Sequence, residues 1–181
     1  MSGLSAKQQT HNYSAWAEID LLALRHNLRR VQSLAPHSRV MAMVKANAYG
    51  HGLVECAAAI EQDAAALAVA RLDEALSLRQ AGLKQPLVLM STHWTSDVLL
   101  AAQEHDIQLV IGSSEQLKII TDRVLPDPLT LWLKHDSGMH RMGLNDVDFQ
   151  SAIRSLSTHG NIKQLRLMTH LATADELDDP T

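Results

Sequence analysis

The sequence predicts an α/β fold with a parallel sheet at its centre, and two features lead to this prediction. Six short apolar runs alternate with segments whose apolar residues recur at helical spacing, along most of the 181 residues. Such alternation is typical of strand–helix–strand units joined by right-handed crossovers. The runs are apolar at consecutive positions, as in strands that are covered on both faces. A doubly wound sheet and a (β/α)8 barrel both satisfy this pattern.

The expected elements follow one another without a linker. The first is a helix over residues 21–34, preceded by Asp20 as a capping residue and followed by Pro36. Further helices are expected over residues 53–62, 72–81, 96–105, 113–124 and 146–157, with Ser113 and Gln116 in the positions of a capping box. Strands are expected over residues 39–44, 66–70, 86–90, 108–111, 129–134 and 164–169. No Gly-x-Gly-x-x-Gly follows the first strand, which argues against a dinucleotide-binding sheet.

Composition and charge exclude several classes of protein. The 16 basic residues against 20 acidic ones argue against a nucleic-acid-binding protein, which needs clustered lysine and arginine. The single cysteine, Cys56, excludes an internal disulfide and a cysteine-rich zinc module. The longest apolar run, residues 64–70, is too short to cross a membrane. Residues 1–12 are polar and unlike a secretory signal, so we expect a polar tail, one domain over residues 13–181 and a cytoplasmic protein.

The first candidate for chemistry is Lys45, at the end of the first expected strand, within the segment 44–52 (VKANAYGHG). An ammonium group is costly to bury unless it is paired or neutralised. Desolvation lowers the pKa of an amine, and the neutral amine is a nucleophile toward carbonyl groups. The alternative is a lysine that has reached the solvated end of its strand.

The second candidate is the segment 131–143, where a strand ends in a loop rich in charged residues. It carries Lys134, Asp136 and Arg141 close together, and Arg141 has the planar fork that binds a carboxylate through two hydrogen bonds. A surface loop with a salt bridge is the alternative. His135 and His140 lack a third ligand at convincing spacing, so we expect no metal site.

The third candidate is His170, just after the last expected strand, in the segment 169–175. Alone, it could contact a ligand or bond to a backbone carbonyl group. Taken together, Lys45, Arg141 and His170 follow three parallel strands, and such strand ends converge on one mouth if the sheet closes into a barrel. The residues therefore favour a barrel enzyme with a reactive lysine.

These segments, in this order and spacing, resemble the bacterial alanine racemases, enzymes of fold type III that depend on pyridoxal 5′-phosphate. The resemblance extends from Tyr13 onward, and the segment VKANAYGHG is its most specific part. Ser137 stands where many relatives have threonine, and His135 replaces a residue that is usually apolar. The matching segments are residues 15–20 (AWAEID), 24–28 (LRHNL), 44–52, 134–143 and 169–175.

The resemblance implies a role for each matching residue. Lys45 is expected to hold pyridoxal 5′-phosphate as a Schiff base and then to act as the acid and base on one face of alanine. Tyr49 is expected to bind the cofactor phosphate, and His170 to pack against the pyridine ring. Arg141 is expected to contact the phenolic oxygen of the cofactor and the substrate carboxylate. Lys134 is expected to carry a carbamate, formed with CO2, that orients Arg141.

The resemblance also implies that family members are about twice as long as this chain. The second half holds barrel strands seven and eight, a C-terminal β-domain, and the opposite-face tyrosine that a partner subunit contributes in a homodimer. We therefore expect an incomplete (β/α)8 barrel with about six of its eight strands, no C-terminal β-domain, and open edges at the first and sixth strands.

The function implied is the interconversion of L-alanine and D-alanine, which supplies D-alanine for peptidoglycan, with this chain as the cofactor-binding part. Two alternatives stay open. One is a catalytically inactive, truncated family member that folds only with a partner. The other is a pyridoxal phosphate-binding barrel of another type.

Overall fold

A computed structural model describes residues 15–176, so the predicted tail at residues 1–12 lies outside the described part. The sheet contains β1 (Met41–Met43), β2 (Ala66–Val69), β3 (Leu87–Leu89), β4 (Ile107–Ile111), β5 (Leu129–Lys134) and β6 (Ile162–Met168). The helices are α1 (Leu21–Leu34), α2 (Lys45–Tyr49), α3 (Leu53–Ile60), α4 (Leu72–Gln80), α5 (Ser96–Glu104), α6 (Ser114–Thr121) and α7 (Asp146–Leu156). Each predicted strand and helix is present, with ends that differ by a few residues.

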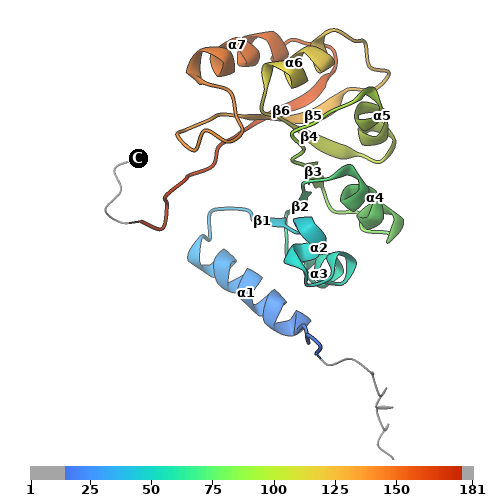
Figure 1. The fold of residues 1–181 in the computed structure, drawn as a ribbon, viewed down its shortest axis with the longest axis vertical. Helices are drawn as coiled ribbons and strands as arrows, with labels where there is room; N and C mark the ends of the chain where they lie inside the picture. The colour runs from blue at the N-terminus through green and yellow to red at the C-terminus, as the bar shows by residue number, and fades with distance from the viewer. Residues whose placement is uncertain (1–14, 177–181) are drawn as a thin grey trace, which may run out of the picture.

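The order of the strands decides between the two architectures that the apolar pattern left open. All neighbouring strands are parallel, and they lie side by side in chain order from β1 to β6. A doubly wound sheet reverses its order at a switch point, whereas consecutive order is that of a (β/α)8 barrel. Figure 1 shows the sheet as an open arc with α4 to α7 along its outer side. The barrel is not closed, because β1 and β6 are edges of the described sheet.

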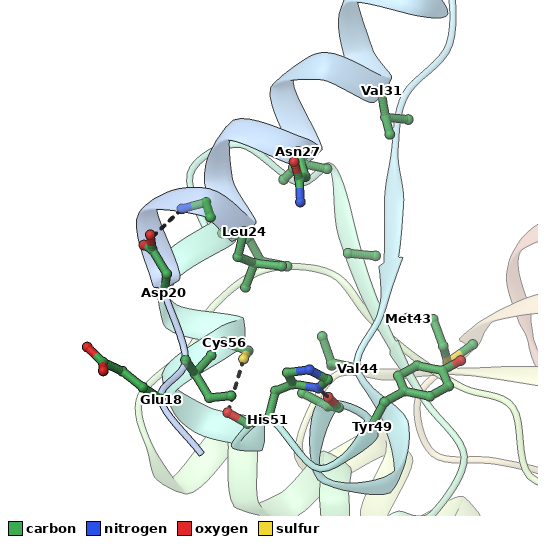
Figure 2. Close-up of a pocket in the computed structure, with 16 residues that line it drawn as sticks. Glu18, Asp20, Leu24, Asn27, Val31, Met43, Val44, Tyr49, His51 and Cys56 are labelled. Carbon is green, nitrogen blue, oxygen red and sulfur yellow. Dashed lines mark hydrogen bonds between the residues drawn. The ribbon is translucent and has the colours of Figure 1, made fainter. Parts of the chain in front are cut away.

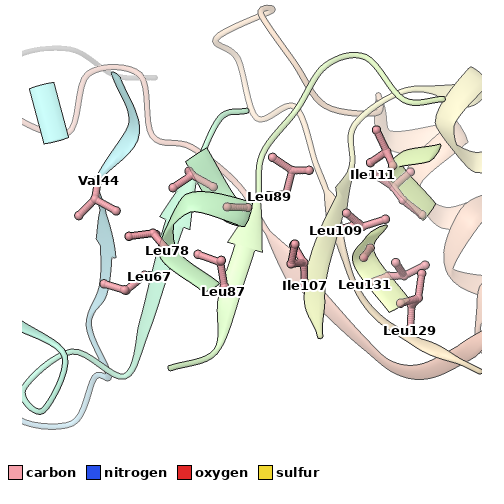
Figure 3. Packing of buried hydrophobic residues seen from close by; sticks show 14 of the residues in the cluster. Val44, Leu67, Leu78, Leu87, Leu89, Ile107, Leu109, Ile111, Leu129 and Leu131 are labelled. Atoms are coloured by element: carbon pink, nitrogen blue, oxygen red, sulfur yellow. The ribbon is translucent and has the colours of Figure 1, made fainter. Parts of the chain in front are cut away.

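Apolar side chains form one layer on each side of the sheet. The outer layer lies between the strands and the helices, and Figure 3 shows part of it. The inner layer is smaller, with Ala68, Val88 and Val110 at its centre. Two-sided burial, as predicted, holds for β2 and β3, which are buried throughout, but it is wrong for β6. That strand is an edge, and its Leu167 is 55% exposed.

The two predicted helix starts differ in outcome. Asp20 caps α1 as predicted, and its carboxylate accepts hydrogen bonds from the amides of Leu22 and Ala23. The capping box at α6 is only half formed. Ser113 accepts a hydrogen bond from the Gln116 amide, but the Gln116 side chain does not return to Ser113 and binds the end of a neighbouring strand instead.

Asp63 links α1 to the rest of the domain through ion pairs. Its two carboxylate oxygens accept hydrogen bonds from Arg25 at 3.1 Å and Arg29 at 3.2 Å, both on α1. Burial alone would raise the pKa of Asp63, but the hydrogen bonds and charges of the two arginines outweigh burial and lower it. Helix α1 is thus held by charge at its middle, while its C-terminal residue Leu34 is exposed.

Replacing Leu89 by alanine should lower the free energy of unfolding by about 2–5 kcal/mol, because the fully buried side chain leaves a cavity in the outer layer. The matched control is Leu100→Ala on α5, where the side chain is 58% exposed and the expected loss is within about 0.5 kcal/mol. Urea unfolding followed by circular dichroism measures both variants. Equal losses would contradict the assignment of the core.

Candidate functional site

Lys45 follows β1, whose end was expected at Val44, and it opens a left-handed turn. Strand β1 ends at Met43, and the four residues after Lys45 have φ angles between 51° and 56°. None of the four is glycine. The left-handed conformation costs an L-residue roughly 1–2 kcal/mol, because Cβ approaches the following carbonyl oxygen. Backbone strain of this kind is concentrated at functional sites.

Contacts from outside the turn hold this conformation. The carboxylate of Glu74 accepts a hydrogen bond from the Ala46 amide at 2.6 Å. The side chain of Asn47 accepts one from the Leu53 amide at 2.8 Å, at the start of α3. Gly50 ends the turn with a φ of 88°, which suits a residue without Cβ. Neither the turn nor Glu74 is predicted from the sequence; the local signal for the turn is an asparagine followed by two nearby glycines.

Tyr49, the predicted phosphate ligand, lies at the end of the left-handed turn. The Lys45 amine lies 6.0 Å from the centre of the Tyr49 ring, within the range of a cation–π contact. Tyr49 is 60% exposed, so its side chain is accessible from the solvent. The turn therefore places the predicted reactive amine and a phenol on the same rim of the sheet.

Lys134, the last residue of β5, lies close to two further cations. Its pKa is lowered, first by burial and then by the positive charges of Arg141 and Lys45, against the opposing effect of Asp136. Lys45 and Arg141, 96 positions apart in sequence, thus act on the same amine. Among residues 15–176, no carboxylate forms a salt bridge with any of these three cations. The carboxyl ends of β1 and β5 therefore form an electropositive mouth.

The loop that carries Arg141 is folded back on the end of β5. Asp136 accepts hydrogen bonds from the amides of Gly138 and His140, which lower its pKa. Gly143 has a φ of 139°, and a Cβ atom there would lie 2.6 Å from the Asp136 amide nitrogen, so only glycine fits. The Leu144 amide then bonds to the Lys134 carbonyl at 2.9 Å. This closure keeps Arg141 beside Lys134.

His170 follows β6 on the same rim and is exposed. Its carbonyl accepts a hydrogen bond from the Ser137 hydroxyl at 3.2 Å, so the loops after β5 and β6 are connected. Thr169 adds a hydrogen bond to the His135 carbonyl at 3.1 Å. His135 itself binds Asp146 through its ring. The structure thus brings the His170 loop to the Arg141 loop, but no contact joins the His170 ring to Lys45.

An apolar groove runs along the free edge of β1, between that strand and α1 (Figure 2). It has a volume of about 690 Å³. Leu24 and Leu28 of α1 line one side, and Met43 and Tyr49 line the other. The groove adjoins the mouth through Tyr49 but does not include Lys45, Lys134 or Arg141.

Comparison with known proteins identifies the family. Residues 19–181 match the family described as alanine racemase, N-terminal domain. The chain belongs to this family. It is 48% identical over 164 residues to the alanine racemase of Xanthomonas axonopodis pv. citri and 46% identical to the catabolic alanine racemase of Pseudomonas putida. The crystal structure of the biosynthetic alanine racemase from Pseudomonas aeruginosa superimposes with a TM-score of 0.85 at 36% identity over 90% of this chain.

The chain spans less than half the length of these alanine racemases. The match covers 91% of this chain but 44% of the Xanthomonas protein, and 45% of the Pseudomonas aeruginosa structure. Family membership and the incomplete barrel therefore agree with what the motifs predicted. Within residues 15–176, no helix combines the length and the apolar character needed to cross a membrane.

The lowered pKa of Lys134 predicts how this alanine racemase domain reacts with acetic anhydride. Acetylation of Lys134 should begin at a lower pH than that of lysine in a short peptide, because more of the amine is neutral at each pH. Arg141→Gln should move the profile part of the way back to higher pH, since a nearby positive charge is removed while burial remains. Mass spectrometry of peptides labelled over a pH series measures both profiles.

The control for this experiment is Arg154→Gln, which removes an exposed arginine on α7. It should leave the Lys134 profile unchanged. A shift of the same size in both variants would show that net charge, and not the proximity of Arg141, sets the pKa of Lys134.

Proposed function

We propose that this chain is the cofactor-binding part of a pyridoxal 5′-phosphate-dependent alanine racemase, which interconverts L-alanine and D-alanine. The observation that carries the proposal is the electropositive mouth, where Lys45, Lys134 and Arg141 converge next to Tyr49. The names of the relatives support the reaction. Active sites of (β/α)8 barrels lie at this end of the strands.

The residues at the mouth fit this cofactor by their chemistry. Pyridoxal 5′-phosphate carries a phosphate, a phenolic oxygen and an aldehyde, and the first two are anionic or hydrogen-bond acceptors. Arg141 would hold the phenolic oxygen and the substrate carboxylate, and the Tyr49 hydroxyl would bind the phosphate. The Lys45 amine would hold the cofactor at its aldehyde carbon. His170 would pack against the pyridine ring from the loop after β6.

The residues of this chain would bind the substrate and move one proton. When bound, the cofactor takes up the electron pair that remains when the α-carbon loses its proton. The Lys45 amine would hold the cofactor in the absence of substrate, and with substrate bound it would take or return the α-proton on one face. Arg141 would keep the substrate carboxylate in place during the transfer. Inversion needs a second acid and base on the opposite face.

Lys134 would act through a carbamate. The neutral amine attacks the carbon of CO2, a nitrogen–carbon bond forms, and a proton leaves to solvent. Its lowered pKa supports this role, because only the neutral amine reacts. The product carries a negative charge beside Arg141, so it would replace a repulsion between two cations by an attraction and fix the guanidinium group.

The assembly and the product of the whole protein are inferred from its family. We infer that residues 13–181 form the barrel part and that the active form is a homodimer, in which a partner subunit supplies the opposite-face tyrosine. The proposed product, D-alanine, would serve peptidoglycan. These parts rest on family membership, since the match covers less than half the length of the relatives.

Trapping with borohydride tests the role of Lys45. After incubation with pyridoxal 5′-phosphate, reduction should leave a stable adduct on Lys45, and Lys45→Ala should abolish both the adduct and the visible absorbance of the bound cofactor. Peptide mass spectrometry locates the adduct. Lys84, Lys118 and Lys163 serve as internal controls, and an adduct on one of them instead of Lys45 would refute the assignment.

Activity should depend on a second protein part. Residues 1–181 alone should not racemise L-alanine at a useful rate, because each proton-transferring group contributes about 10²–10⁴-fold and the opposite-face group is missing. Co-expression with the C-terminal part of the Xanthomonas relative should restore turnover, measured with a D-amino acid oxidase assay. Turnover by residues 1–181 alone in the ordinary range of about 1–10³ s⁻¹ would contradict this expectation.

A further inference from the structure

Glu74 joins two neighbouring strand ends on the rim of the barrel. It is the third residue of α4 and is only 8% exposed. One carboxylate oxygen accepts a hydrogen bond from the Ala46 amide at 2.6 Å. The other accepts hydrogen bonds from the amides of Ala70 and Arg71, at 3.1 Å each. A buried carboxylate thus connects the residue after Lys45 with the end of β2.

Gln116 has the same position in α6 and makes the corresponding connection. It is the third residue of its helix and is 3% exposed. Its side-chain oxygen accepts a hydrogen bond from the Gly112 amide at 2.7 Å, and its nitrogen donates one to the Ser91 carbonyl at 2.9 Å. Both side chains therefore bind the turn between their own helix and the strand before it, and also the chain just after the neighbouring strand, which is β1 for Glu74 and β3 for Gln116. They differ in the polarity of the second contact, which is an N–H group at Ala46 and a C=O group at Ser91.

We propose that Glu74 is a positioning residue that sets the direction of the Lys45 side chain by holding the N–H group of Ala46. The proposal rests on the proposed role of Lys45 as the cofactor-binding amine. The Ala46 N–H group lies in the same rigid peptide plane as the Lys45 carbonyl. A hydrogen bond to it therefore fixes the rotation of the backbone on the C-terminal side of the Lys45 α-carbon.

The left-handed turn explains why this contact matters. Ala46 has a φ of 53°, and alanine prefers the right-handed region. Without Glu74 the peptide plane would be free to rotate toward that region, and the direction of the Lys45 side chain relative to the turn, and so its approach to Lys134 and Arg141, would no longer be fixed. A role limited to starting α4 needs only the hydrogen bonds from Ala70 and Arg71. The additional contact to Ala46 is the one that reaches the site.

Glutamine cannot replace Glu74 at this position. All three partners of the carboxylate are N–H donors, and a carboxylate has two accepting oxygens. An amide has one accepting oxygen and one NH₂ group, which would face a donor. Glu74→Gln is therefore a nearly isosteric variant that loses the hydrogen bond to Ala46 or those to Ala70 and Arg71. Gln116→Glu is its matched control, because it places a carboxylate oxygen against the Ser91 carbonyl and so breaks the corresponding contact at α6.

The test compares these two variants in the 181-residue chain. The first readout is the rate of borohydride-trapped adduct formation with pyridoxal 5′-phosphate at Lys45, divided by the rate at Lys84 in the same molecule. Glu74→Gln should lower this ratio on the order of 10²-fold, the effect of a misplacement of about 1 Å. Gln116→Glu should lower the melting temperature to a similar extent and leave the ratio unchanged.

Rescue separates positioning from general loss of structure. Ala46→Gly in the Glu74→Gln background should restore most of the ratio, because glycine adopts the left-handed conformation without a Cβ penalty. The two single variants and the double variant form a cycle, in which a direct coupling appears as non-additivity. A purely structural role for Glu74 predicts additive effects.

Three results would overturn the proposal: an unchanged ratio in Glu74→Gln, an equal fall in Gln116→Glu, or additivity in the cycle. If Glu74→Gln does not fold, hydrogen exchange of the wild-type chain decides, since an Ala46 amide that exchanges as fast as in a peptide has no stable hydrogen bond. If the wild type forms no adduct at Lys45, the proposed function fails. The positioning role is then judged by the acetylation rate of Lys45 without cofactor, which Glu74→Gln should change and Gln116→Glu should not.

Discussion

Parallel pairing of the strands in chain order is the constraint on which the rest of the structure depends. Each strand–helix unit returns the chain to the same end of the sheet, so every strand finishes on one rim. Lys45, Lys134 and His170 lie far apart in the sequence, but each is at or just after the end of such a strand. The same constraint separates an outer apolar layer under the helices from a smaller inner one.

The rim concentrates positive charge at a place where that charge does not stabilise the fold. Repulsion and burial together lower the pKa of Lys134, and no carboxylate among residues 15–176 forms a salt bridge with it, Lys45 or Arg141. A chain selected for stability alone would place carboxylates here, as Asp63 is placed between Arg25 and Arg29 on the other side of the domain. Strain and unpaired charge in one place are typical of a binding site, where a ligand supplies the missing partner.

Local features of the structure could be predicted from the pattern of apolar residues and caps, and features that depend on distant contacts could not be predicted from that pattern. Apolar periodicity located every strand and most helices because it reflects burial of nearby residues. The barrel order was predicted only through the resemblance to a known family, and the lowered pKa of Lys134 and the left-handed turn after Lys45 were not predicted. Each of these three features depends on contacts between distant segments. The capping box at α6 was half wrong for the same reason, because the Gln116 side chain binds Ser91 at the end of β3.

The polarity of the backbone at each strand end explains which side chain stands at the third position of the following helix. After β1 the chain turns left-handed and presents the Ala46 N–H group. Glu74 of α4 must therefore accept a hydrogen bond there, as it also does from the Arg71 amide in the turn before α4. After β3 the chain presents the Ser91 carbonyl, so the connecting side chain of α6 must donate on one side and accept on the other. Glutamate meets the first requirement and glutamine the second. The choice between two similar residues therefore follows from the handedness of one turn on the neighbouring strand.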